Sequence, residues 1–186
     1  MDPRDQLAVI IPTLTAIVDR IEPADLENPT PCATFTVQGV LDHMIGLAAT
    51  FVPAFRGEAD IEASTSDTTE GGVPTVAFRR GMAGLLDAVN SPGAMDRTVS
   101  APFGDVPGSV FARFVAFDGL IHGYDLASST AQPYDVPHDL VVSVDSFARE
   151  ALSPDMRDGD TFALETTAPA GANLLEKLVA FSGRTL

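Results

Sequence analysis

Asp118 and His122 stand four residues apart inside a long apolar segment, and they are the chain's clearest candidates for metal chemistry. On an α-helix, residues i and i+4 lie on the same face, so this carboxylate and this imidazole project side by side. Such a pair offers two ligand atoms to a divalent cation. The helical projection also places the pair on a stripe with phenylalanines, so it is expected to face the interior, where a buried Asp needs a partner.

His43 is the best candidate for that partner. It lies at the edge of the apolar stripe of another amphipathic segment, which begins after Thr36 and ends near Gly57. If the two helices are neighbours, two imidazoles and one carboxylate converge. Such a set leaves coordination positions open, which is typical of a catalytic rather than a structural metal site. A dication with one carboxylate keeps a single positive charge, which an incoming thiolate or hydroxide would cancel.

The same residues also have a plainer interpretation. A lone His at the edge of an apolar stripe is often half-buried with one hydrogen bond, and Asp118 and His122 could form an ordinary hydrogen bond within the helix. Asp125 lies about one turn beyond His122. It either orients that imidazole through the free ring nitrogen or is a polar residue near the end of the helix.

Helical periodicity predicts the elements that position these residues. The predicted helices span residues 3–22, 37–57, 74–89, 108–129, 137–152 and 173–181. The acidic stretch 58–72 is predicted to be a mobile loop, residues 99–106 have an extended character, and 161–166 is predicted as a strand. The fold class is therefore expected to be all-α, a four-helix bundle with a short C-terminal extension that contains one strand and a helix.

The length of 186 residues fits a single domain spanning 1–186. Phe117 and Leu120 fall on the outer face of the predicted helix 108–129, so either the bundle covers that face or the chain forms a homodimer through it. Arg79, Arg80 and Arg113 are expected at the surface, with binding of a substrate carboxylate as the alternative.

The composition limits the partners and the compartment. The formal charge of −15 argues against nucleic acid and anionic membranes, and it suits a small neutral or cationic ligand better. Cys32 is the only cysteine, so an internal disulfide is impossible and a reducing, cytoplasmic location is expected. No signal peptide and no apolar run of about 18 residues is evident. Cys32 itself is expected to be a small buried residue rather than a reactive thiol.

Three short motifs occur in order along the chain. They are Thr30-Pro-Cys-x-x-Phe-Thr-Val-x-x-Val-Leu-x-His43, Asp118-x-x-x-His122-Gly-Tyr-Asp-Leu-Ala127 and Leu178-Val-Ala-Phe-Ser-Gly-Arg184. In this order they resemble the actinobacterial metal-binding proteins of the DinB/YfiT-like superfamily. These proteins are related to the N-terminal domain of mycothiol-dependent maleylpyruvate isomerase, and the resemblance covers essentially the whole chain.

This resemblance implies a DinB-like four-helix bundle that holds a divalent metal, zinc or nickel, through His43, Asp118 and His122. It also implies a low-molecular-weight thiol, mycothiol or bacillithiol, whose sulfur binds the metal as thiolate. The isomerase relatives usually carry Glu where this chain has Asp118, so direct ligation and a bridging water are both open. The full isomerase has an additional C-terminal domain, whereas this chain has about 34 residues after the fifth predicted helix. Maleylpyruvate isomerisation itself is therefore not expected.

The leading functional hypothesis is a thiol-dependent transferase or isomerase that acts on a small electrophile, with a small-molecule thiol as partner. Two enzymatic alternatives are a hydrolase that uses metal-activated water and an oxygen-dependent enzyme that uses ferrous iron. The non-enzymatic alternative is a protein that binds a metal or a small ligand without catalysis.

Overall fold

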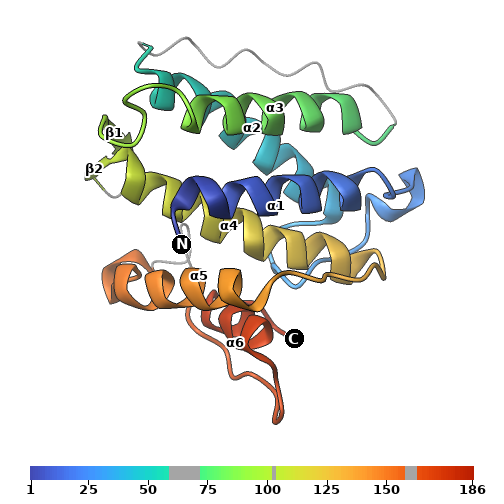
Figure 1. Ribbon diagram of the computed structural model, residues 1–186. Coiled ribbons are helices and arrows are strands. Elements are labelled where there is room, and N and C mark those ends of the chain that lie inside the picture. Colours follow the sequence, from blue (N-terminus) through green and yellow to red (C-terminus); the bar gives the residue numbers. More distant parts are fainter. Residues whose placement is uncertain (59–71, 102–103, 158–162) are drawn as a thin grey trace.

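The computed structural model describes residues 1–58, 72–101, 104–157 and 163–186, and helices dominate it (Figure 1). The helices are α1 (Pro3–Val18), α2 (Val37–Arg56), α3 (Thr75–Val89), α4 (Gly108–Ser129), α5 (His138–Ala151) and α6 (Leu174–Phe181). The shorter elements are the 3-10 turns η1 (Pro23–Asp25) and η2 (Pro154–Met156) and the strands β1 (Thr98–Ala101) and β2 (Gly104–Pro107). In the described ranges, every helix is too short or too polar to cross a lipid bilayer.

The first four helices form a bundle. Helix α2 packs on α3, α1 packs on α4, and contacts of α1 with α3 and of α2 with α4 close the arrangement. Helix α5 packs on the side of α4 away from α3, and α6 packs on α5 (Figure 1). The predicted all-α class, a DinB-like four-helix bundle with a C-terminal extension, is confirmed.

Local capping explains why the helices begin where the sequence predicts. The N-cap of α2 is Thr36, whose side chain accepts a hydrogen bond from the Gly39 backbone N–H at 3.2 Å. The last turn of α2 ends at Gly57, which adopts a left-handed backbone conformation with φ 69°. Helix α4 has the predicted bounds, whereas α1 ends at Val18, earlier than the predicted residue 22.

The predicted strand at 161–166 is wrong where the structure describes it. Residues 163–166 are irregular, and the Thr166 backbone N–H donates to the Ala180 carbonyl of α6 at 3.0 Å, so this segment is bonded to a helix. Residues 161–162 lie outside the described residues, as do residues 59–71 of the predicted mobile loop. Of the residues 99–106 that were predicted to be extended, 99–101 belong to β1 and 104–106 to β2, which pair antiparallel with Thr98 opposite Pro107, and residues 102–103 lie outside the described residues.

The outer face of α4 is covered within the chain. Phe117 and Leu120 are fully buried in the core, which extends from the bundle to α5 and α6. The segment between α4 and α5 contains Tyr134, whose hydroxyl donates a hydrogen bond to the Leu120 carbonyl at 2.9 Å. A Cβ at Gly123 would lie 2.3 Å from that hydroxyl oxygen, so the close approach beside His122 requires glycine. Of the two sequence alternatives for this face, coverage by the same chain is the observed one.

Candidate metal centre

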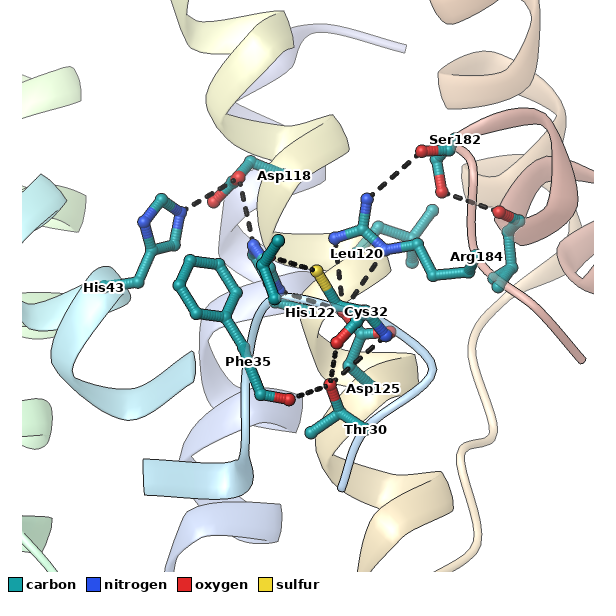
Figure 2. Close-up of polar contacts among 12 residues, drawn as sticks. Thr30, Cys32, Phe35, His43, Asp118, Leu120, His122, Asp125, Ser182 and Arg184 are labelled. Atoms are coloured by element: carbon teal, nitrogen blue, oxygen red, sulfur yellow. Dashed lines mark hydrogen bonds and ion pairs between the residues drawn. The ribbon is translucent and has the colours of Figure 1, made fainter. Parts of the chain in front are cut away.

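Helices α2 and α4 bring three candidate ligands together, as Figure 2 shows. Asp118 Oδ1 lies 3.6 Å from His43 Nε2 and 3.4 Å from His122 Nε2. One ligand atom from each of the three residues lies within 4.8 Å of the other two. Helices α2 and α4 are therefore neighbours, as the predicted convergence of these residues demands. The Asp118 carboxylate lies between the two imidazoles.

The spacing and chemistry of these atoms fit a divalent cation. Zinc binds imidazole nitrogen and carboxylate oxygen at about 2.0–2.2 Å, and tetrahedral angles then put neighbouring ligand atoms about 3.3–3.6 Å apart. Both distances from Asp118 Oδ1 fall in or at the edge of this range. Two imidazoles and one carboxylate are a ligand set for a divalent transition metal, and they leave coordination positions free for another molecule.

The site has a closed side and an open side. The side chain of His122 is 4% exposed and that of Asp125 is fully buried. In contrast, the side chains of His43 and Asp118 are 28% and 32% exposed. A molecule that approaches the three candidate ligands must therefore come from the side of His43 and Asp118.

Asp125 orients the buried imidazole. Its Oδ2 lies 3.0 Å from His122 Nδ1, while the Nε2 of the same ring faces Asp118. When Nδ1 carries the proton and donates it to Asp125, the lone pair of a neutral ring is on Nε2, where a cation would bind. Asp125 is thus a partner of the ring and not an isolated polar residue at the end of the helix.

Arg184 is a member of this cluster that sequence reasoning missed. Its Nη2 and Nε donate to Asp125 Oδ2 at 3.2 and 3.4 Å, and its side chain is 12% exposed. The preceding residue, Gly183, has a backbone φ of 93°, which glycine adopts readily. A Cβ on Gly183 would lie 2.6 Å from the Cβ of Ala163, so the approach of this segment to Ala163 also favours glycine. The sequence contains this arginine in its third motif, but nothing in the spacing indicates that it reaches a residue 59 positions earlier.

The segment before α2 covers the imidazoles. The ring of Phe35 lies 5.1 Å from the ring of His43 and 6.0 Å from that of His122, measured between centroids. Thr30 fixes this segment by donating its hydroxyl to the Phe35 carbonyl at 2.8 Å. Cys32 lies in the same segment and is half-buried, with its Sγ 3.4 Å from Thr34 Oγ1. Its expected burial as a core residue is wrong, because it belongs to a turn and not to a packed helix face.

The charges of the cluster shift the proton affinities of His122 and Asp118. Burial by itself would lower the pKa of His122, but the nearby carboxylates of Asp118 and Asp125 outweigh burial and raise it from 6.5 to about 9. Burial would raise the pKa of Asp118, and the two imidazoles outweigh this and lower it well below its usual value. Without a metal, His122 is therefore a cation at neutral pH, and metal binding has to displace its proton.

Comparison with known proteins identifies the family of the chain. The family model described as "Mycothiol maleylpyruvate isomerase N-terminal domain" matches residues 7–127. The chain belongs to this family. The matched residues include the four bundle helices from Leu7 onward as far as Ala127, and with them His43, Asp118, His122 and Asp125.

Two relatives extend the similarity beyond the matched domain. They are uncharacterised proteins of Mycobacterium tuberculosis, one from strain CDC 1551 / Oshkosh and one from strain ATCC 25618 / H37Rv. Each is 30% identical to this member of the family over 180 residues, covering 92% of this chain and 91% of the relative. No solved structure matches the chain.

Replacing Arg184 by Met should destabilise the protein, because the fully buried Asp125 would lose its guanidinium partner. We expect a loss of about 3 kcal/mol in the free energy of unfolding, measured by urea denaturation of the metal-free protein. The matched control is Arg56→Met, which breaks the more exposed pair with Asp87 and should cost about 1 kcal/mol or less. Equal losses in the two variants would contradict the special role of the buried pair.

The stability of the metal-free protein should fall as the pH rises from about 6.5 to about 9. The pKa of His122 is higher in the folded state than its ordinary value, so its contribution is complete below pH 6.5 and disappears as the pH passes about 9. Urea denaturation across this range, compared between the wild type and His122→Gln, isolates the effect. Parallel curves for the two proteins would show that His122 does not carry it.

Proposed function

We propose that this protein binds a divalent cation, zinc or nickel, through His43, Asp118 and His122, and catalyses the reaction of a small-molecule thiol with a small electrophile. The observation that supports the metal site is the convergence of two imidazole nitrogens and one carboxylate oxygen within 4.8 Å. The family description, which names mycothiol, supports a low-molecular-weight thiol as the co-substrate. The reaction class is thus a transferase or an isomerase, in a cytoplasmic setting where such thiols are reduced.

When bound at this position, a dication would lower the pKa of a thiol and hold it as the nucleophilic thiolate. The residues of the chain make this state favourable. Asp118 contributes one negative charge, so the site keeps a positive charge that attracts a thiolate. His43 and Asp118 stand at the open side, where the thiol and the electrophile enter.

The surrounding residues hold the ligands in place. Asp125 fixes the ring of His122, and Arg184 fixes Asp125. The ring of Phe35 covers both imidazoles and restricts the access of water to them. A preorganised set of ligands strengthens the interaction between the bound cation and an incoming anion.

The metal site can be tested by adding zinc or nickel to the chelator-treated protein. The wild type should bind about one equivalent in competition with a chromophoric chelator, and His43→Ala and His122→Ala should each lose at least tenfold in affinity because one of three ligands is missing. His138→Ala is the matched control, since this histidine is exposed on α5 and should bind the metal like the wild type. Full binding in both ligand variants would overturn the assignment.

The thiol reaction can be tested with the metal-loaded protein, mycothiol and a panel of electrophiles. We expect conjugates or isomerised products whose formation requires both the thiol and His122, measured by mass spectrometry. Turnover of an ester or amide without added thiol would favour the hydrolase instead. Stoichiometric metal binding without turnover of any substrate would leave a metal-binding protein and refute the catalytic part of the proposal.

A further inference from the structure

The two imidazoles of the candidate centre are held by different means. His122 is buried, and its Nδ1 lies 3.0 Å from Asp125 Oδ2, so a hydrogen bond fixes this ring. His43 is partly exposed, and its Nε2 faces Asp118 (Figure 2). Among the residues that the structure describes, none forms a hydrogen bond with His43 Nδ1. The orientation of His43 therefore depends on something other than a hydrogen bond to its outer nitrogen.

A histidine ring without such a bond is free to rotate unless packing restrains it. The torsion between Cβ and the imidazole has broad minima, so the ring can turn its nitrogens away from a site at little cost. In metal sites, a carboxylate or carbonyl usually binds the outer nitrogen and sets the orientation of the ring. A side chain that must be immobilised when a ligand binds lowers the affinity through its lost entropy.

The ring of Phe35 lies where this restraint is needed. Its centroid is 5.1 Å from that of His43, and the two ring planes make an angle of 33°. The centroids of His43 and His122 are 4.9 Å apart, and those of Phe35 and His122 are 6.0 Å apart. Separations of about 4.5–7 Å are typical of contacts between aromatic rings. The three rings thus form one packed cluster, in which His43 has two ring neighbours.

Phe35 is itself fixed against α2. Its carbonyl accepts the hydrogen bond from the Thr30 hydroxyl, and its backbone N–H donates to the Cys32 carbonyl at 3.1 Å. A Cβ on Gly39 would lie 3.1 Å from Phe35 Cδ1 and 3.4 Å from Phe35 Cβ, so the ring lies in the space that this glycine leaves. Gly39 precedes His43 by about one turn of α2. The same face of the helix therefore carries the space for the phenyl ring and the imidazole that it contacts.

We propose that Phe35 is the positioning residue of His43, whose imidazole it holds toward Asp118 by ring packing over Gly39. This inference rests on the proposed function, because it concerns how one of the three candidate metal ligands is held. A hydrogen bond to Asp125 fixes the buried ligand His122, whereas an uncharged ring fixes the partly exposed one. The second restraint adds no charge, so it leaves the charge balance of the centre unchanged.

The affinity of the chelator-treated protein for zinc provides the test. It is measured in competition with a chromophoric chelator for the wild type, Phe35→Ala, His43→Ala and the double variant. Phe35→Ala should weaken zinc binding about tenfold, because His43 must then be immobilised when the metal binds. In the His43→Ala background the same substitution should change the affinity by less than about twofold, because the ring has no ligand left to position.

A second pair of variants displaces the phenyl ring without deleting it. Gly39→Leu fills the space that the ring of Phe35 occupies, so it should push the ring from His43 and weaken zinc binding about tenfold. Gly46→Leu is the matched control on the same helix, because Gly46 is exposed and a Cβ there would meet nothing within 4 Å. This variant should bind zinc like the wild type. Circular dichroism of each variant checks that it is folded.

The outcomes separate the role of Phe35 from the metal site and from the reaction. Equal affinities of the wild type, Phe35→Ala and Gly39→Leu would overturn the proposal, and so would equal losses from Phe35→Ala in the two backgrounds. Either result, with tight binding by the wild type, would leave the metal site intact. Absence of zinc binding by the wild type would refute the metal site as well. The test involves no turnover, so a failed conjugation assay would refute the reaction alone.

Discussion

A carboxylate buried in an apolar helical bundle needs a positive partner, and the candidate centre is arranged around this requirement. Asp125 is fully buried, and its Oδ2 contacts both the imidazole of His122 and the guanidinium of Arg184. His122 in turn faces Asp118, which also faces His43. From Arg184 through Asp125 and His122 to Asp118, cationic and anionic groups therefore alternate, and each group restrains its neighbours.

The two ends of this row of charged groups differ in their exposure to solvent. At the Arg184 end the row is closed to solvent, so His122 has one fixed orientation and presents its Nε2 to Asp118. At the Asp118 end the row is partly open to solvent, because the side chains of His43 and Asp118 are 28% and 32% exposed. A buried, fixed imidazole on one flank and partly exposed ligand atoms on the other are the arrangement that the proposed metal-dependent reaction needs.

The match to the mycothiol maleylpyruvate isomerase N-terminal domain family covers the four-helix bundle from Leu7 to Ala127, and the three candidate ligands lie inside the matched range. The matched region stops at residue 127, before α5, α6 and Arg184. The C-terminal elements of this chain nevertheless contribute to the candidate site. They cover the outer face of α4, and Arg184 supplies the guanidinium that pairs with Asp125. The extension is thus coupled to the centre by a buried ion pair as well as by packing.

The sequence by itself determined the helices, because apolar periodicity and caps such as Thr36 are local properties of the chain. It also determined that Asp118 and His122 share a face, since that follows from a spacing of four on one helix. Only the tertiary structure decided the pairing of Arg184 with Asp125 and the position of Phe35 over the imidazoles. These depend on which helices become neighbours and on how distant segments meet, and local periodicity carries no information about such contacts.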